Sequence, residues 1–239
     1  MTQDNPISTF ESVYAVPLHC DSCVTSVRNA LKEIDGISKF DIDLKSQTLS
    51  VEGSVPPSRI VKAIQSTGKD AIIRGTGRPN SAAVCILESF DEKDRLNPVR
   101  GLARIVSLND KQCLIDLTMN GVTKGIYYPS IRSNGNLSQG ALSTGKSIYD
   151  ISPIEVNEQS DLPDLASGQH FVIASMKIDD LIGRSVIVSQ LKDKVAPDSL
   201  AGVIARSAGI WQNDKEVCSC TGKTVWQERK DAIDKGILF

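Results

Sequence analysis

The first part of the chain switches repeatedly between the apolar spacing of strands and that of helices. A short β-prone run covers residues 12–17. The apolar residues that follow recur at helical spacing, at Val24, Val27, Leu31 and Ile34. Asp21 or Ser22 can cap the start of this helix, and Gly36 can end it. The pattern predicts a strand, a loop and then a helix.

Two half-buried strands and a second helix come next. Apolar and polar residues alternate over residues 40–44 and again over residues 49–52, which predicts a hairpin. The prolines at 56–57 open a second helical face that ends near Gly68, and residues 71–73 predict a last strand. The order βαββαβ is that of a ferredoxin-like unit. We expect this unit to span residues 8–75.

After residue 75 the pattern of apolar and polar residues changes. Residues 76–80 are dense in turn-forming residues and predict a linker. Residues 81–206 carry β-rich runs separated by long loops, most of all between residues 129 and 168, which is typical of a sandwich or barrel. Residues 207–239 are expected to form a short flexible tail, with a helix beginning near Thr224. The predicted fold is therefore α+β and multidomain.

Composition narrows the class of protein. The chain has 239 residues, 40% hydrophobic and 23% charged, which is ordinary for a globular protein of two or three domains. The net charge is -2 and no run of basic residues is present, which argues against nucleic acid as a partner. No apolar stretch approaches the roughly 20 residues that a transmembrane helix needs. We therefore expect a soluble, unsecreted, cytoplasmic protein.

The first cysteine pair is the strongest candidate site. Cys20 and Cys23 lie between the first predicted strand and helix, where a helix N-terminus favours thiolates. Two soft thiolates suit Cu(I), which accepts two ligands in a nearly linear arrangement. In a βαββαβ unit the loop before the last strand lies at the same end, so Lys69 is expected close to the anionic complex. The sequence thus predicts a Cu(I) site supported by Lys69.

Other chemistry also uses this motif. The same spacing occurs in thioredoxin redox motifs and in half of a zinc site, and the motif alone leaves the three interpretations level. The ferredoxin-like order favours copper, because a thioredoxin unit needs a longer α/β pattern and zinc needs two more nearby ligands.

The remaining cysteines fall into two kinds. Cys218 and Cys220 are separated by one residue, so a shared ligand or a strained, oxidising disulfide requires a bent backbone. This pair can exchange disulfides with a partner, take copper from the first pair, or be two ordinary surface thiols. Cys85 and Cys113 lie within apolar runs and are expected to be buried structural residues. His170, in another apolar run, is expected to be a partly buried strand residue.

These residues together resemble the copper chaperones for Cu,Zn superoxide dismutase of the fungal type. The first segment is similar to a heavy-metal-associated domain, with Leu18 in place of the methionine of the family pattern Met-x-Cys-x-x-Cys. The middle segment is similar to superoxide dismutase itself, over residues 101–104, 181–188 and 201–205. The tail matches over residues 218–226. The resemblance implies a Greek-key β-barrel for the middle segment.

The departures from the dismutase pattern imply a loss of that activity. Ser130, Arg132 and Ser189 stand where the enzymes have copper-binding histidines, and no histidine cluster remains for zinc. Ala201 stands where the enzymes have one cysteine of their intrasubunit disulfide. The resemblance implies a metallochaperone that is not an enzyme, with no zinc in the middle domain.

The resemblance also implies a partner. A dismutase subunit dimerises through an isologous surface, so the middle domain is expected to dock on an immature dismutase monomer as a heterodimer, or on itself as a homodimer. The expected contact residues are Ile182, Gly183, Arg184 and Gly202. The tail cysteines are then expected to help deliver copper and oxidise the target's disulfide. The resemblance further implies that a fraction of the protein resides in the mitochondrial intermembrane space.

Two rival hypotheses belong to other classes. One is an active or vestigial superoxide dismutase with an accessory metal domain, which the missing histidines oppose. The other is a structural protein in which the four paired cysteines close one zinc site.

Overall fold

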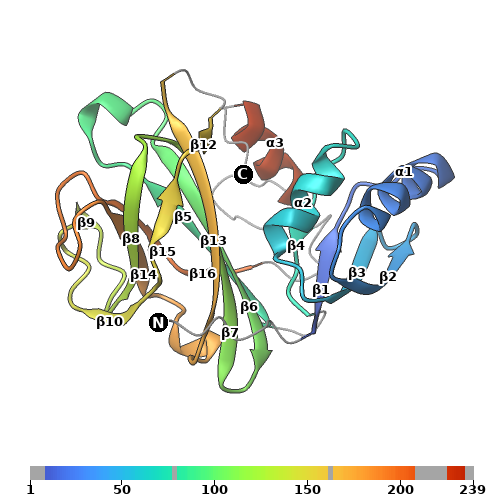
Figure 1. Cartoon of the computed structure of the whole chain (residues 1–239), viewed down its shortest axis with the longest axis horizontal. Helices are drawn as coiled ribbons and strands as arrows, with labels where there is room; N and C mark the ends of the chain where they lie inside the picture. The colour runs from blue at the N-terminus through green and yellow to red at the C-terminus, as the bar shows by residue number, and fades with distance from the viewer. Residues whose placement is uncertain (1–8, 77–79, 161–163, 208–224, 235–239) are drawn as a thin grey trace.

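The computed structural model describes residues 9–76, 80–160, 164–207 and 225–234 (Figure 1). The α-helices are α1 (Asp21–Lys32), α2 (Pro57–Gln65) and α3 (Val225–Asp234), with short 3-10 helices at η1 (Glu92–Asp94) and η2 (Ile178–Asp180). The strands are β1 (Phe10–Ala15), β2 (Ile37–Asp43), β3 (Thr48–Gly53), β4 (Ile72–Ile73), β5 (Ala82–Glu88), β6 (Val99–Asn109), β7 (Gln112–Val122), β8 (Gly125–Arg132), β9 (Ser138–Ala141), β10 (Ser147–Asp150), β11 (Ile154–Val156), β12 (Glu158–Gln159), β13 (Ala166–Ala174), β14 (Ser185–Ser189), β15 (Leu200–Val203) and β16 (Ala205–Arg206).

The N-terminal unit, comprising β1 to β4 with α1 and α2, has the predicted ferredoxin-like order. Its antiparallel sheet runs β2-β3-β1-β4, with both helices packed against it around a shared apolar core. The apolar spacing that predicted α1 is visible in this core, where Val27 and Leu31 are buried against Leu49 and Ile64. The prediction of a βαββαβ unit is confirmed.

The β-rich segment forms a barrel-like antiparallel sheet. Its strands follow the path β10-β8-β14-β15-β5-β6-β7-β13-β12, while β11 pairs with β8 and β16 pairs with β5. At Gly168 on β13, a Cβ would lie 2.6 Å from the carbonyl oxygen of Glu155 on β11, so these two strands pack with their backbones in contact. Because β11 pairs with β8 on its other side, it joins the two regions of the sheet around the apolar core.

The segment between residues 129 and 168 contains more strand than expected. The sequence predicted mainly loop, whereas the structure places β9 to β12 there. Each of these strands is only two to four residues long, too short for an alternating apolar pattern to emerge. Ile154 and Val156 are nevertheless fully buried and help to close the core.

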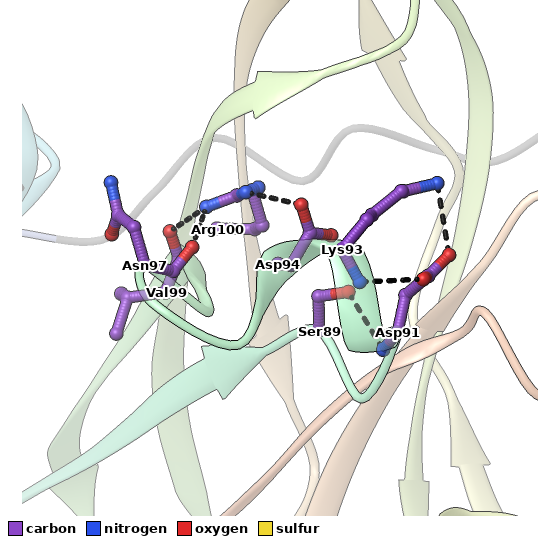
Figure 2. Close-up of polar contacts among 7 residues, drawn as sticks. All are labelled: Ser89, Asp91, Lys93, Asp94, Asn97, Val99 and Arg100. Carbon is purple, nitrogen blue, oxygen red and sulfur yellow. Dashed lines mark hydrogen bonds and ion pairs between the residues drawn. The ribbon is translucent and has the colours of Figure 1, made fainter.

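Polar contacts order the connection between β5 and β6 (Figure 2). The Arg100 guanidinium donates to the carbonyl oxygens of Asn97, at 2.5 Å, and Val99, at 2.9 Å, and it pairs with the Asp94 carboxylate at 2.7 Å. Asp91 accepts from the backbone N–H of Lys93 at 3.1 Å and pairs with its ammonium at 2.9 Å. Arg100 is buried, so its charge depends on these protein acceptors.

A barrel carboxylate caps a helix of the N-terminal unit. Asp116 on β7 is 0% exposed and accepts from the Ser58 backbone N–H at 2.6 Å and from the Ser58 hydroxyl at 2.9 Å. The helix α2 begins after Pro56, whose side chain has no acceptor to cap it. Asp116 therefore supplies from the barrel the acceptor that the helix start lacks. Val106 of β6 also joins the apolar core of the N-terminal unit.

Candidate metal centre

Cys20 lies at the boundary between the first loop and α1. Its backbone is extended, with φ -162 and ψ 170, and its carbonyl accepts from the N–H groups of Cys23 at 3.0 Å and Val24 at 3.3 Å. Cys20 is therefore the N-cap residue, and the expectation of Asp21 or Ser22 in that position is wrong. The first hydrogen-bonded turn closes on the Cys20 carbonyl, which leaves Asp21 inside the helix.

The two sulfurs of this pair face each other. The Sγ atoms of Cys20 and Cys23 are 3.5 Å apart, and both cysteines are free thiols. Cys20 is exposed, whereas Cys23 is half-buried against the apolar core of the N-terminal unit. The pair thus has one sulfur fixed by packing and one accessible from solvent, with both close enough to hold one ion.

Local hydrogen bonds favour the thiolate of Cys20. Its pKa is lowered to about 7, first by the Ser22 hydroxyl, whose Oγ lies 2.9 Å from Sγ, and then by the backbone N–H and the thiol of Cys23. Near neutral pH a substantial fraction of Cys20 is therefore ionised. The thiolate is the form that binds soft metals and attacks disulfides.

Neighbouring residues fix the loop that carries the cysteines. Leu18 is buried in the apolar core, as expected for a residue that replaces methionine. The Gln47 side chain donates to the Leu18 carbonyl at 3.1 Å, and the Gln47 carbonyl accepts from Val16 N–H at 2.9 Å. Sequence reasoning missed Gln47, and it considered Ser22 only as a helix cap. The sequence around Gln47 could not indicate this role, because its hydrogen-bond partners, Val16 and Leu18, lie after β1 and are distant in the chain.

Lys69 lies in the loop between α2 and β4. The strand β4 pairs with the end of β1, with Ile72 opposite Ala15, so this loop lies at the cysteine end of the sheet. The topology agrees with the reasoning that selected Lys69. Its role as a counter-charge for a metal thiolate stays a prediction.

The other cysteines divide as follows. Cys218 and Cys220 lie outside the described residues, and so does Trp211. The helix α3 begins at Val225, which confirms the helix predicted near Thr224. Cys85 and Cys113 are buried, and burial raises the pKa of each thiol to about 12, so the prediction that they are buried is confirmed.

The four predicted interface residues lie together. Gly183 N–H donates to the Ile204 carbonyl at 2.9 Å, and Ile204 N–H donates to the Arg184 carbonyl at 2.8 Å. Ile182 packs on the barrel core, and at Gly202 a Cβ would lie 1.8 Å from the Ile86 carbonyl oxygen. The structure thus brings the two predicted segments into one region.

Two exposed apolar residues extend this region. Ile86 on β5 is 51% exposed and Val203 on β15 is 37% exposed. We call the surface formed by Ile86, Ile182, Gly183, Arg184 and Val203, with the buried Gly202 between Ile86 and Val203, the apolar docking surface, because four of these six residues are the ones that the sequence predicts to dock. Sequence reasoning missed Ile86 and Val203, although the outward positions of their strands could have indicated them.

The residues that the resemblance places at dismutase metal positions lie on adjacent strands. Ser130 and Arg132 are on β8, and Ser189 is on the neighbouring β14. The Ser189 hydroxyl accepts from Leu191 N–H at 3.1 Å, and the Arg132 guanidinium donates to the Gly145 carbonyl. Within the described part of the chain, His, Cys, Asp and Glu side chains nowhere gather in threes to form a metal cluster. His170 lies on β13 and is half-buried, as predicted.

The helices give no sign of a membrane segment. Among the residues that the structure describes, none of the helices is both long enough and apolar enough to span a bilayer.

Comparison with known proteins gives first the domain family of the N-terminal unit and then the family of the whole chain. Residues 13–70 match the heavy-metal-associated domain, the family of the unit that carries Cys20 and Cys23. The chain is 62% identical to the superoxide dismutase 1 copper chaperone of Debaryomyces hansenii, over 96% of this chain and 98% of the relative. It is 46% identical to the protein of that name from Saccharomyces cerevisiae, over 96% of this chain and 98% of the relative. The chain therefore belongs to the family of copper chaperones for superoxide dismutase.

The similarity extends beyond fungi. The copper chaperone for superoxide dismutase of Mus musculus is 29% identical over 90% of this chain and 88% of the relative. These relatives are named as copper chaperones rather than as enzymes. The family resemblance drawn from the sequence is confirmed.

Proposed function

We propose that this chain binds Cu(I) through Cys20 and Cys23, docks on an immature Cu,Zn superoxide dismutase monomer, delivers the ion and promotes formation of the target's intrasubunit disulfide. The observation that carries the proposal is the open thiol pair, with sulfurs 3.5 Å apart and a Cys20 pKa of about 7. In this scheme residues 8–75 form the metal domain, residues 81–206 recognise the target and residues 207–239 form the reactive tail.

The copper step follows from ligand chemistry. Two thiolates bind Cu(I) as a complex of net charge -1, and the protons of both thiols are released on binding. The exposed side of Cys20 leaves room for a third sulfur from an acceptor. The ion then moves by exchange through a three-coordinate intermediate, so it is never free in solution. Lys69 is proposed to stabilise the anionic complex from the neighbouring loop.

The docking step uses the apolar docking surface. Ile86 and Val203 expose apolar side chains. Gly183 is exposed, and a Cβ there would meet nothing within 4 Å, whereas Gly202 is buried against the Ile86 backbone. A dismutase monomer presents the equivalent surface of its own fold, so one isologous contact gives a heterodimer. A homodimer through the same surface is the competing state. The two assemblies exclude each other because they bury the same residues.

The tail step is a disulfide exchange. A target thiolate attacks the Cys218–Cys220 disulfide and forms a mixed disulfide, and the second target thiolate then displaces the tail sulfur. The target loses two electrons and gains a disulfide, while Cys218 and Cys220 become thiols. Each round consumes the tail disulfide, so an oxidant such as dioxygen must form it again by removing two electrons from Cys218 and Cys220. We propose that the protein acts in the cytoplasm and, in part, in the mitochondrial intermembrane space.

Copper binding is tested by titration. Purified chain is titrated with Cu(I) against a chelating competitor, for the natural protein and for Cys20→Ser with Cys23→Ser. We expect the double variant to lose the N-terminal site, while His19→Ala, which changes an exposed neighbour, keeps it. A zinc preference with one ion shared by all four paired cysteines supports the structural-zinc rival instead. Unchanged Cu(I) binding in the double variant rejects the assignment of the site.

The tail is tested by maturation of the target. With Cys218→Ser and Cys220→Ser, we expect the heterodimer to persist and the target disulfide to stay unformed. Full maturation of the target by this variant would defeat the role given to the tail. Superoxide consumption by the copper-loaded chain alone would favour the dismutase rival.

A further inference from the structure

The turn between β2 and β3 contains a residue in a strained backbone conformation. Gln47 has φ 54, in the left-handed region that favours glycine or asparagine over a residue with a long side chain. Such a conformation persists only where the surrounding structure holds it, and strained residues of this kind gather at functional sites. Gln47 lies at the cysteine end of the sheet, because the next residue, Thr48, pairs with Ala15 at the end of β1.

Hydrogen bonds within the turn fix this conformation. The Asp43 carboxylate accepts from the backbone N–H groups of Lys45 at 2.8 Å and Ser46 at 3.2 Å. The hydroxyl oxygens of Ser46 and Thr48 lie 2.7 Å apart, so the residues on both sides of Gln47 contact each other. Side-chain contacts of this type are typical of tight turns. The turn therefore holds Gln47 by contacts of its own.

Gln47 holds the chain that precedes Cys20 at two points. Its carbonyl accepts from the Val16 N–H at 2.9 Å, and its side-chain Nε2 donates to the Leu18 carbonyl at 3.1 Å. Any residue at position 47 can make the main-chain contact, whereas the second contact needs a side-chain donor of this length. Beyond Leu18, only His19 separates the chain held by Gln47 from Cys20.

The two sulfurs of the metal centre are held by different parts of the chain. Cys23 lies in the first turn of α1 and packs against the apolar core. Cys20 is exposed, and although its carbonyl is bonded within the helix, its amide side belongs to the loop. The direction of the Cys20 side chain therefore depends on the path of the loop. The separation of 3.5 Å between the two Sγ atoms depends on the same path.

We propose that Gln47 is a positioning residue of the metal centre: by holding Val16 and the Leu18 carbonyl, it keeps Cys20 Sγ opposite Cys23 Sγ and so sets the affinity of the pair for Cu(I). This inference rests on the proposed function, because it names a determinant of copper binding at the same site. The hydrogen bonds of Gln47 go to the loop backbone, so it acts on the sulfurs through the chain. Loss of such an outer contact typically weakens metal binding by about 10- to 100-fold.

Replacement by glycine separates positioning from stability. In Gln47→Gly the backbone adopts φ 54 without strain and keeps its bond to Val16, so the denaturant midpoint of unfolding is expected to stay unchanged. The side-chain bond to the Leu18 carbonyl is lost, and the Cu(I) affinity is expected to fall about tenfold. Gln47→Asn is expected to behave in the same way, because asparagine tolerates the left-handed region but is one methylene too short to reach Leu18.

The affinity is measured in the full-length, reduced chain with Cu(I) buffered by a chelating competitor. A brief pulse of alkylation, read by peptide mass spectrometry, gives the occupancy of Cys20 and Cys23 alone, so that copper bound elsewhere does not enter. Asp193→Gly is the matched control, because Asp193 is an exposed residue with φ 60 in the loop after β14 of the barrel. It is expected to leave the Cu(I) affinity at its natural value.

Three results overturn the proposal. In the first, Gln47→Gly and Gln47→Asn bind Cu(I) as tightly as the natural chain. In the second, Asp193→Gly loses as much affinity as they do, so that the effect does not belong to this turn. In the third, both variants at position 47 lose affinity only as far as the N-terminal unit unfolds, which assigns Gln47 to the stability of the fold.

A measurement without metal distinguishes this inference from the proposed function. The contacts that Ser22 and Cys23 make with Cys20 Sγ lower the pKa of that thiol to about 7, and they depend on where the sulfur lies. In Gln47→Gly the pH profile of Cys20 alkylation is expected to shift upward. A shifted profile in a protein that binds no Cu(I) rejects the carrier function and keeps the positioning role. An unshifted profile with unchanged Cu(I) affinity rejects the positioning role and leaves the carrier function in place.

Discussion

The hydroxyl of Ser22 sets the chemistry of the exposed thiol beside it. It lies 2.9 Å from Cys20 Sγ and is the largest cause of the lowered pKa of that thiol. A hydrogen bond to the charged form favours ionisation, and here it acts at a helix N-terminus, where the backbone N–H groups act in the same direction. Cys20 can thus be a thiolate while it remains open to solvent.

Replacement of Ser22 is expected to raise the pKa of Cys20 from its value of about 7 toward that of an ordinary thiol. The thiolate fraction falls as pH drops below the pKa, so Ser22→Ala should slow alkylation of Cys20 by iodoacetamide at neutral pH and leave the rate at high pH unchanged. The measurement is a pH profile of alkylation, read by peptide mass spectrometry. Ser26→Ala, one helical turn further on, is the control. Identical profiles for Ser22→Ala and the natural chain contradict the prediction.

Leu18→Met introduces at a buried position the methionine that the resemblance implies for this site. The two side chains have similar volumes, so the change in unfolding free energy is expected to stay below about 1.5 kcal/mol. Cu(I) binding at Cys20 and Cys23 is expected to be unchanged. Denaturant unfolding and copper titration check the two statements. A large loss of stability would show that the loop depends on the branched shape of leucine.

At the scale of elements, α2 depends on the barrel for its N-terminal cap. Asp116 accepts two hydrogen bonds from Ser58, and the Gln169 side chain donates to both residues. Arg104, opposite Asp116 on the neighbouring strand, is also buried. The hydrogen bonds join the start of α2 to β7 and β13 of the barrel, and the positive charge of Arg104 on β6 favours the ionised form of Asp116.

Asp116→Ala is expected to destabilise the protein by about 3 kcal/mol, because it leaves the Ser58 donors and the Arg104 charge without their buried partner. Denaturant unfolding followed by circular dichroism measures the loss. The control is Asp110→Ala, an exposed carboxylate in the β6–β7 turn, which is expected to cost no more than about 0.5 kcal/mol. A loss in Asp116→Ala as small as that of the control would show that the cap contributes little.

The elements that the sequence predicted are those with local signals. The spacing of Val27 and Leu31 and the alternation around Leu49 predicted α1 and the hairpin. The motif located the cysteine pair, and the ferredoxin-like order was needed to favour copper over zinc or redox chemistry. The hydrogen bonds between Ser58 and Asp116 could not be predicted from the local sequence. The two residues are far apart in the chain, and neither stands out from the sequence pattern of its own segment. Short strands such as β11 were missed for a related reason, since their pairing depends on register rather than on composition.

At the scale of the whole molecule, the apolar docking surface makes recognition testable. Ile86→Glu places a charge on it and is expected to weaken the complex with a dismutase monomer at least tenfold, which corresponds to about 1.4 kcal/mol. Sedimentation of mixtures gives the affinity. Ile126→Glu is the matched control, because Ile126 is 54% exposed at the start of β8, away from Ile86 and Val203. Equal affinities for the two variants would show that the partner binds elsewhere.

The described thiols differ widely in acidity, and this difference has a consequence for the molecule under oxidative stress. The pKa is about 7 at Cys20 and about 12 at Cys85 and Cys113. Peroxides attack thiolates, so at cellular pH they consume the exposed sulfur long before the barrel cysteines react. Among the thiols that the structure describes, Cys20 of the candidate metal centre is therefore the first to be oxidised. Under the proposed function, a molecule oxidised at Cys20 keeps its barrel cysteines reduced, so it can still dock on a dismutase monomer and block it without delivering copper.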